Sequence, residues 1–448
     1  MSQEVLPSGV LDQVKALGSA DIVVGVPSFN NARTVGHVIQ AIEVGLQKYF
    51  PQSRAVVVTS DGGSSDGTPE VVLSARADDT HLLLLSHRLS PVQRLVTPYH
   101  GLPGKGSAFR AIFRVAELLR ARACAVVDSD LRSITPEWMD LLLRPVLHAA
   151  YDYVAPYYLR HKYDGTITNS IVYPLTRALY GQRVRQPIGG DFGFSDRLAA
   201  HFLRHDVWDT DVARYGIDIW MTTTALCGDF RLCQSFLGAK IHDAKDPGAD
   251  LSAMLTQVVG SLCELMEIHA ARWTAVAGSR EVPVFGFRYG VGLEPVAVNV
   301  ERMIHHFRRG VESLGEIWQQ ALSPDTVHDL RLLIRLDASE FHLPDELWVR
   351  IVYEFTAARH RRCLPRDHLL RSLTPLYLGR VASFVLETRD SLAEEVEAKI
   401  ERLCLLFEEH KPYLIRHWGS APVNQPSPRR QDDQQPGTNP APILAAPK

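Results

Sequence analysis

Short runs of apolar residues alternate with segments of helical periodicity over residues 21–270. The runs 21–27, 55–59 and 124–127 contain few polar side chains, which is typical of strands buried on both faces of a parallel sheet. Between the first two runs, apolar residues recur three and four positions apart, as on one face of a helix; they are Val35, Val38, Ile39, Ile42 and Leu46. This alternation predicts an α/β fold with a mostly parallel, Rossmann-like sheet.

The hydrophobic pattern changes after residue 270. Long stretches of residues 271–418 show helical periodicity in Leu, Arg and Glu, so we expect a helical C-terminal region that packs on the first domain or on a partner subunit. Residues 419–448 are rich in Pro, Gln and Asp and hold few large apolar residues, and we expect this tail to be disordered. The predicted domains are therefore 21–270 and 271–418, between an N-terminal extension (1–20) and the tail.

Composition excludes several classes of partner. The 448 residues carry a net charge of -3, which gives no electrostatic reason to expect nucleic acid or an anionic membrane. The six cysteines are far apart and form no Cys-x-x-Cys pair, as expected for free thiols in a reducing compartment. No apolar signal segment or membrane-spanning run stands out. We expect a cytoplasmic enzyme that forms a homodimer.

Two carboxylates follow one of the predicted buried strands. Asp128 and Asp130 stand one residue apart, directly after the apolar run that ends at Val127. Ligands of open α/β sheets bind at the carboxyl ends of the strands, where a divalent cation or sugar hydroxyls would relieve the repulsion between two carboxylates. Acidic residues also end strands in turns that bind nothing. The motif therefore indicates a metal site without establishing one.

Two further motifs are suited to a phosphorylated ligand. Lys105 lies among glycines just before a predicted helix, where an ammonium group, the helix dipole and backbone N–H groups can meet a phosphate. Gly106 stands where a P-loop needs a hydroxyl, and a solvated turn is the alternative interpretation. The Gly-rich bend 189–191 would let the backbone approach a ligand closely. Asp218 opens a later helix, where an acid can also simply offset the helix dipole.

The order of these motifs resembles one enzyme family. Residues 21–270 are similar to the GT-A glycosyltransferases that make glucosylglycerate, mannosylglycerate and glucosyl-3-phosphoglycerate. The elements that carry the resemblance occur in the family's order: the proline-ended first strand, Ser60-Asp61 with Asp66-Gly67-Thr68, Pro103-Gly104-Lys105-Gly106, Asp128-Ser129-Asp130, the bend Gln186 to Asp191, Gly216-Ile217-Asp218 and the isolated His242. Several elements in one order are more specific than any one of them.

The resemblance implies a role for each motif. It implies that Asp130 and His242, with Asp128, hold Mg²⁺ or Mn²⁺, and that a UDP- or GDP-hexose is the donor. Asp218 and Lys105 are the implied catalytic residues, with Asp218 orienting substrate rather than attacking it, in a transfer that retains the anomeric configuration. The residues implied to bind the nucleotide-sugar are Pro27, Asp61, Lys105, Asp128, Ser129, Gly189, Gly190 and Asp191.

The acceptor site is where this sequence departs from part of the family. Relatives that use phosphoglycerate carry Gly-Arg-x-Thr, and the matching positions here are Gly165, Thr166, Ile167 and Thr168. A hydroxyl cannot replace a guanidinium at a dianionic phosphate, so we expect D-glycerate or a similar small hydroxy acid, bound by Gly165, Thr166, Thr168 and Asp218. The segment 160–162 (Arg-His-Lys) could restore the missing charge, which leaves 3-phosphoglycerate open.

Two other functions remain open at this stage. A sugar-phosphate nucleotidylyltransferase would need a Gly-rich, Arg-bearing loop after the first strand, and 26–31 is not such a loop. A binding-only regulator would be favoured by loss of an acid from the metal set, but Asp128, Asp130 and His242 are all present. A metal-dependent hexosyltransferase that makes a compatible solute is therefore the leading hypothesis.

Overall fold

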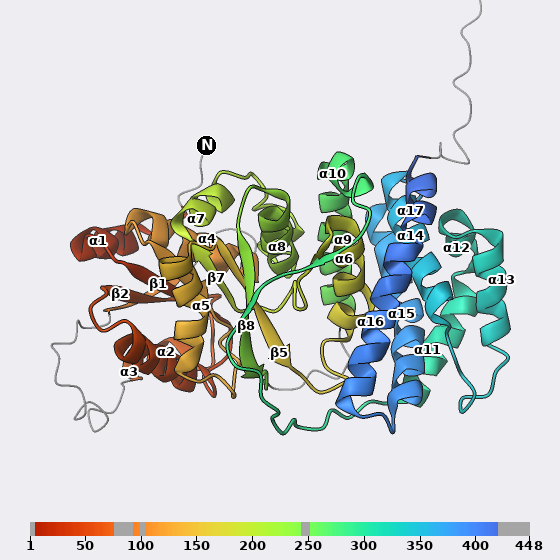
Figure 1. The fold of residues 1–448 in the computed structure, drawn as a ribbon, viewed down its shortest axis with the longest axis horizontal. Helices are drawn as coiled ribbons and strands as arrows, with labels where there is room; N and C mark the ends of the chain where they lie inside the picture. Colours follow the sequence, from red (N-terminus) through yellow and green to blue (C-terminus); the bar gives the residue numbers. More distant parts are fainter. Residues whose placement is uncertain (1–4, 76–92, 99–103, 243–250, 420–448) are drawn as a thin grey trace, which may run out of the picture.

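The computed structural model describes residues 5–75, the backbone of 93–98, and residues 104–242 and 251–419. Figure 1 shows a sheet with helices on both faces, joined on one side to a group of long helices. The predicted α/β fold with a mostly parallel sheet and a helical C-terminal region is confirmed. The expected disordered tail, apart from Gly419, lies outside the described residues.

An eight-stranded sheet forms the centre of the first domain, with the order β10-β8-β5-β7-β4-β1-β2-β3. Within it only β7 is antiparallel to its neighbours. The strands are β1 (Ile22–Ser28), β2 (Ala55–Asp61), β3 (Gln93–Pro98), β4 (Ala123–Val126), β5 (Tyr153–Leu159), β7 (Phe192–Ser195), β8 (Leu232–Ala239) and β10 (Val284–Phe285). Two-residue strands β6 (Gln182–Arg183) and β9 (Arg280–Glu281) pair separately.

Successive residues of β1 point into two different cores. Ile22, Val24 and Val26 belong to the core beneath α2 (Val35–Tyr49) and α5 (Glu137–Ala149), whereas Val23 belongs to the larger core beneath α4 (Lys105–Leu118). This alternation follows from the two-residue period of a strand, and burial on both sides explains the apolar run in the sequence. The helices of this domain are α2 (Val35–Tyr49), α3 (Thr68–Ser74), α4 (Lys105–Leu118), α5 (Glu137–Ala149), α6 (Tyr173–Tyr180), α7 (Asp196–Leu203) and α8 (Ile217–Cys227).

The larger core continues without a break into the C-terminal helices. They are α9 (Ser252–Ile268), α10 (Ala270–Thr274), α11 (Val300–Ser313), α12 (Gly315–Ala321), α13 (Pro324–Leu333), α14 (Asp345–His360), α15 (Arg366–Thr388), α16 (Ala393–Glu409) and α17 (Lys411–Trp418). The region 271–418 also contains two short strands. β10 extends the edge of the sheet beside β8, and β9 pairs with β6. The domain boundary at residue 270 stays a prediction.

The N-terminal segment is folded onto the first domain. The expected N-terminal extension contains α1 (Ser8–Leu17), whose Val10 and Val14 are buried in the larger core.

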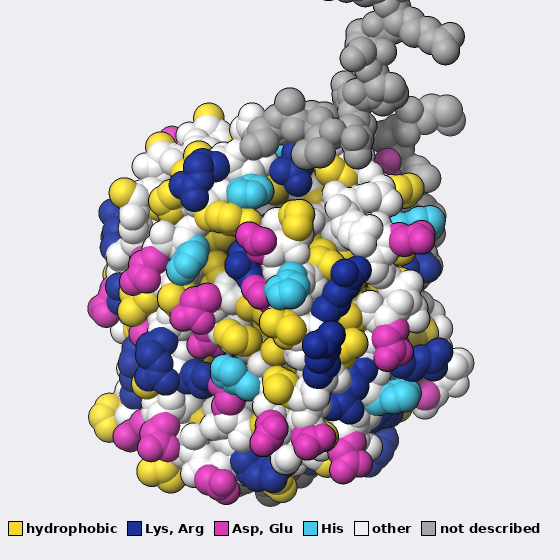
Figure 2. Space-filling model, turned by 90° about the vertical axis from the view of Figure 1, so that its right-hand side faces the viewer, with side chains coloured by type: hydrophobic (Ala, Val, Ile, Leu, Met, Phe, Trp, Pro, Cys, Tyr) yellow, Lys and Arg dark blue, Asp and Glu magenta, His cyan; other side chains and the backbone are white. Residues whose placement is uncertain are grey.

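Acidic and basic side chains are interspersed on the surface of the C-terminal helices in Figure 2. All six cysteines are free, as predicted. No helix in the described part of the chain combines the length and apolar character that a membrane span needs.

Buried arginines join the helical region to the first domain. Arg177 on α6 is fully buried, and its guanidinium donates from Nη1 to Glu401 at 2.6 Å and from Nε to Glu408 at 2.5 Å, both on α16. Arg185 makes a bidentate pair with Glu397, at 2.7 and 3.0 Å, on the same helix. Since a guanidinium cannot be deprotonated in a protein, these arginines require α16 to be in place.

We predict that Glu408→Gln lowers the free energy of unfolding by about 3 kcal/mol, because it removes the more buried of the two carboxylates that pair with the buried Arg177. Glu401→Gln is the matched control on the same arginine. The Glu401 side chain is 43% exposed, so its loss should cost about 1 kcal/mol or less. Urea denaturation of both variants measures the difference, and equal losses would contradict the buried-charge explanation.

Candidate active site

A cleft of about 620 Å³ lies at the carboxyl ends of the strands. Its walls come from the ends of β1 and β4, the start of α4, the segment after β5, the bend before β7, the start of α8 and the segment after β8. All the predicted site residues line this cleft except Asp61 and Asp191. The fold therefore brings together residues that are more than two hundred positions apart, from Pro27 to His242.

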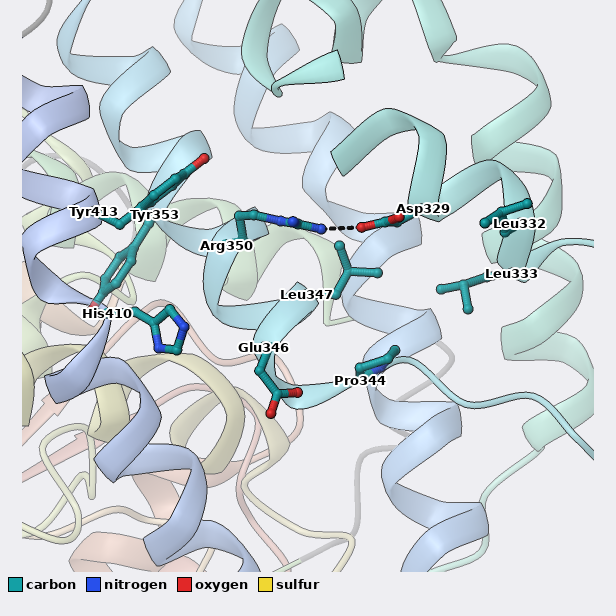
Figure 3. Close-up of a pocket in the computed structure, with 10 residues that line it drawn as sticks. All are labelled: Asp329, Leu332, Leu333, Pro344, Glu346, Leu347, Arg350, Tyr353, His410 and Tyr413. Atoms are coloured by element: carbon teal, nitrogen blue, oxygen red, sulfur yellow. Dashed lines mark hydrogen bonds and ion pairs between the residues drawn. The ribbon is translucent and has the colours of Figure 1, made fainter. Parts of the chain in front are cut away.

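A second cavity, of about 640 Å³, lies in the helical region. Figure 3 shows its lining residues on α13, on α14 and at the start of α17, with Arg350 paired to Asp329. None of the predicted site residues lines it. We therefore look for the active site at the first cleft and not at this cavity.

Asp128 is held between two lysines. Its Oδ1 lies 2.9 Å from Lys105 Nζ, and its Oδ2 lies 2.8 Å from Lys240 Nζ. Burial alone would raise the pKa of Asp128, but the two ammonium groups outweigh it and hold that pKa below its usual range. Both oxygens are thus engaged by protein cations, and the expected contact of Asp128 with a metal ion or ribose stays a prediction.

Asp191 lies beneath this pair and is fully buried. Its Oδ2 accepts hydrogen bonds from Lys240 at 2.8 Å and from the Tyr158 hydroxyl, while its Oδ1 accepts one from the Asp128 backbone N–H at 2.8 Å. Lys240 also donates to the Gly189 carbonyl at 2.7 Å. Asp191 was expected to touch the donor sugar, but here it supports Lys240 and Asp128 from behind the cleft wall.

Gly190 makes room for this arrangement. Its φ is +91°, a region that L side chains rarely adopt, and a Cβ added there would collide with the Asp128 carboxylate. The Gly-rich bend therefore brings backbone close to a carboxylate of the protein itself.

Asp218 reaches the network from the first turn of α8. Its Oδ2 lies 3.2 Å from Lys105 Nζ, and its Oδ1 is buried with no hydrogen-bond partner among the described residues. Burial raises the pKa of Asp218, and Lys105 opposes that rise only in part. A buried carboxylate oxygen without a partner is costly, so a hydroxyl donor from a ligand in the cleft would stabilise it.

Asp130 and His242 are brought together by backbone pairing. Leu131 forms an antiparallel bridge with His242, and the Arg132 N–H donates to the Ile241 carbonyl at 2.9 Å. The His242 Nε2 lies 3.5 Å from Asp164 Oδ2, and this hydrogen bond raises the pKa of His242. Both residues line the cleft, and a carboxylate and an imidazole are side chains that can hold a divalent ion such as Mn²⁺ or Mg²⁺.

The protein supplies few ligands for such an ion. Among the described residues no group of three or more His, Cys, Asp and Glu side chains is placed to hold a metal. Asp130 and His242 would therefore need ligand oxygens, such as those of a diphosphate, to complete the coordination shell.

The expected nucleotide end of the cleft contains a loop that is held by internal hydrogen bonds. Asp61 accepts hydrogen bonds from the hydroxyl of Ser28 at 2.9 Å and from the N–H groups of Gly63 and Ser64 at 2.9 and 2.8 Å. Ser129 donates to the Asn31 side chain at 2.8 Å. The Asp61 carboxylate is thus used to shape the loop, and its contact with a base or ribose stays a prediction.

The expected acceptor segment is held by the helical region. The Thr166 hydroxyl lies 2.5 Å from the Tyr377 hydroxyl on α15. Thr168 begins the π-helical turn η2 (Thr168–Val172), and Trp348 on α14 donates to the Ser170 carbonyl at 2.7 Å. Gly165, Thr166 and Thr168 all line the cleft, so the C-terminal helices set the shape of one of its walls.

Sequence reasoning missed Lys240 and Tyr377. Lys240 directly follows an apolar strand and is only 6% exposed. A lysine at such a position is rarely buried unless it is paired, and that signal could have been used. Tyr377 gave no signal, because it lies in a long helix about two hundred residues from Thr166; only packing shows the contact.

Comparison with known proteins gives a remote likeness. No family model and no curated protein matches the sequence. Two structures of glucosyl-3-phosphoglycerate synthase from Mycobacterium tuberculosis match: a complex with Mn²⁺, UDP and glucosyl-3-phosphoglycerate (22% identity, 58% of this chain and 85% of that one, TM-score 0.42), and a complex with Mn²⁺, UDP-glucose and phosphoglyceric acid (21% identity, 59% and 86%, TM-score 0.42). A structure described only as a mycobacterial protein matches with 23% identity over 57% of this chain and 78% of that one, with a TM-score of 0.41.

We predict that Gly190→Ala destabilises the protein by about 1–3 kcal/mol, since the methyl group meets Asp128 and the backbone is strained. Gly278→Ala is the control, because nothing lies within 4 Å of a Cβ at that position; its effect should stay within about 0.5 kcal/mol. Thermal and urea unfolding measure both, and a Gly190→Ala variant as stable as the wild type would show that the bend can shift freely.

Proposed function

We propose that the protein is a metal-dependent glycosyltransferase that moves a hexose from a nucleotide-sugar to a small hydroxy acid. One observation carries the proposal: a cleft at the carboxyl edge of the sheet gathers the motif residues around the buried pairs of Lys105 and Lys240 with Asp128. Its volume of about 620 Å³ is in the range of small-molecule sites, which a nucleotide-sugar would require. The motif order in the sequence supports the same class.

The donor diphosphate would lie near the start of α4. Lys105 is the first residue of this helix, so its ammonium group and the partial positive charge of the helix N-terminus act on the same region. The two carboxylates beside Lys105 raise its pKa, although burial acts in the opposite direction. Lys105 therefore keeps its positive charge at any physiological pH and can attract the departing diphosphate.

The divalent ion would be held by Asp130 and His242, with Asp164 orienting the imidazole. When bound, such an ion neutralises charge on the nucleoside diphosphate. The protein's own contribution is to fix the two ligands through the pairing of Leu131 with His242. Asp128 would keep its ion pairs with Lys105 and Lys240 in this arrangement.

Asp218 would orient the sugar rather than attack it. One of its oxygens is held by Lys105, and the other accepts no hydrogen bond from the described residues. That buried oxygen can accept a hydrogen bond from a hydroxyl of the sugar. Retention of configuration would then follow from front-face attack, in which the leaving phosphate takes the proton of the acceptor hydroxyl.

For the acceptor we propose D-glycerate or a similar small hydroxy acid. Thr166 stands where phosphoglycerate-using relatives carry an arginine, and its hydroxyl is already paired with Tyr377. No guanidinium therefore projects from this position to meet a phosphate. Whether the hexose is glucose or mannose, and the nucleotide UDP or GDP, is a matter for assay.

Metal removal provides the first test. We expect a chelator to abolish transfer and Mn²⁺ or Mg²⁺ to restore it, and Asp130→Ala and His242→Ala each to lower activity by about 100-fold or more. Both side chains contribute little core packing, so far-ultraviolet circular dichroism and the melting temperature should change little. Full activity of the Asp130 variant in chelator would refute the metal assignment.

The acceptor is tested by a screen of UDP- and GDP-hexoses against D-glycerate and 3-phosphoglycerate. We expect kcat/KM to favour D-glycerate by about tenfold or more, the effect of one unsatisfied charge-assisted contact to phosphate. Glycerol serves as the control that lacks an acid group. A wild type that prefers 3-phosphoglycerate would make the enzyme a glucosyl-3-phosphoglycerate synthase instead.

A further inference from the structure

The start of α4, which carries Lys105, rests on the short helical turn η3 (Asp211–Ala213). A Cβ added at Gly104 or at Gly106 would lie 2.5 or 1.8 Å from a carbonyl oxygen of this turn. Glycine on each side of Lys105 therefore lets the two backbones meet with no side chain between them. Because backbone atoms cannot yield as a flexible side chain can, a shift of η3 would move the residue that we place beside the donor diphosphate.

The residues that follow η3 enter the cleft. The Asp211 carbonyl accepts hydrogen bonds from the N–H groups of Arg214 and Gly216 at 2.9 and 3.1 Å. Arg214, Tyr215 and Asp218 line the cleft. The turn η3 thus supports both the start of α4 and the segment that leads into α8.

The Asp211 side chain anchors η3 to the C-terminal helices. Its Oδ2 forms an ion pair with Nη2 of Arg366, the first residue of α15, and the Asp211 side chain is 12% exposed. Gly260 on α9 leaves space for this pair, since a Cβ there would lie 2.2 Å from Arg366 Nη2 and 3.0 Å from Asp211 Oδ2. Salt screens such a partly buried pair less than a surface pair, and the loss of one partner would leave the other charge partly buried without it.

Arg366 has two further carboxylate neighbours, and both are more exposed than Asp211. Its Nε lies 3.5 Å from Oε1 of Glu264 on α9, and its Nη1 donates to Asp367 at 3.1 Å. Neither carboxylate belongs to η3, and neither Arg366 nor Asp211 is among the residues that line the cleft. The pair with Asp211 is therefore the contact through which Arg366 can act on the cleft.

We propose that Arg366 is a positioning residue, which acts through Asp211 and η3 to hold Lys105 where the donor nucleotide binds; this rests on the proposed function of the cleft. Coulomb attraction falls with distance, and the backbone N–H groups of the first turn of α4 would move together with the Lys105 ammonium group. The sheet and α4 still carry the groups that meet the donor, and Arg366 sets where the start of α4 lies.

The test is calorimetric titration of the full-length protein with UDP and with GDP, each in the presence of Mn²⁺. Arg366→Gln and Asp211→Asn should each weaken binding of the preferred nucleotide by about 3- to 30-fold, the range for residues that do not touch the ligand. The double variant should bind about as weakly as either single variant, because both changes remove the same pair. Arg366→Lys should recover part of the affinity, since it keeps the charge but loses the planar fork.

The direction of the Asp211 effect separates positioning from general charge. If the two residues acted only through their charges, loss of the carboxylate would strengthen binding of an anionic nucleotide, whereas loss of the guanidinium would weaken it. Positioning requires weaker binding in both variants. Glu264→Gln is the matched control, because it removes a neighbour of the same guanidinium and leaves the pair with Asp211 intact; it should change the affinity by less than about twofold.

A second control separates positioning from a loss of stability. Arg366→Gln should lower the melting temperature, because it breaks a partly buried pair, so affinities are measured well below that temperature. Arg350→Gln breaks the pair with Asp329 at the second cavity and should destabilise the protein without changing nucleotide affinity. In steady-state kinetics, Arg366→Gln should raise the KM for the nucleotide-sugar and leave the KM for the acceptor unchanged. Destabilised Arg366 and Asp211 variants with normal nucleotide affinity would assign the pair to the fold and overturn the inference.

The outcomes also distinguish this inference from the proposed function. If the wild type transfers hexose and Arg366→Gln binds the nucleotide as tightly as the wild type, the function stands and the inference fails. If the wild type binds UDP or GDP but no nucleotide-sugar supports transfer, the function fails, and weaker binding in both single variants still supports the inference. Tighter binding in Asp211→Asn would overturn the inference, as would a wild type that binds neither nucleotide.

Discussion

The cleft depends on the burial of Asp128 between Lys105 and Lys240. These residues come from the end of β4, the start of α4 and the end of β8, so their ion pairs fix three elements relative to one another. Taking such charges out of water is expensive unless every group is paired. Asp191 and Asp218 complete the pairing from below and from α8.

The charge balance of this network has a consequence for ligands. Three carboxylates face two ammonium groups, and burial raises the pKa of both Asp191 and Asp218. A diphosphate beside Lys105 would therefore share its ammonium group with Asp128 and Asp218.

The two walls of the cleft have different structural origins. The wall near Lys105 and Asp130 is built on the carboxyl ends of sheet strands and the start of α4. The wall at Thr166 and Thr168 is held by the C-terminal helices, through Tyr377 and Trp348. In the proposed transferase, the sheet would fix the donor and the helical region would shape the acceptor site. The buried arginines on α6 and after it hold the two parts together.

The sequence by itself determined the class of fold and most of the residues that meet in the cleft. Apolar runs such as 21–27 predict buried parallel strands because both faces of such a strand are covered, and the polar residues that follow each strand must then gather at one edge. The tertiary structure decided which partners those side chains contact. Asp61 and Asp191 point into protein, Lys240 lines the cleft, and Tyr377 holds Thr166 in its wall, although neither Lys240 nor Tyr377 belongs to a motif. Local patterns record which face of an element is buried, whereas pairing between distant side chains depends on packing that no local pattern contains.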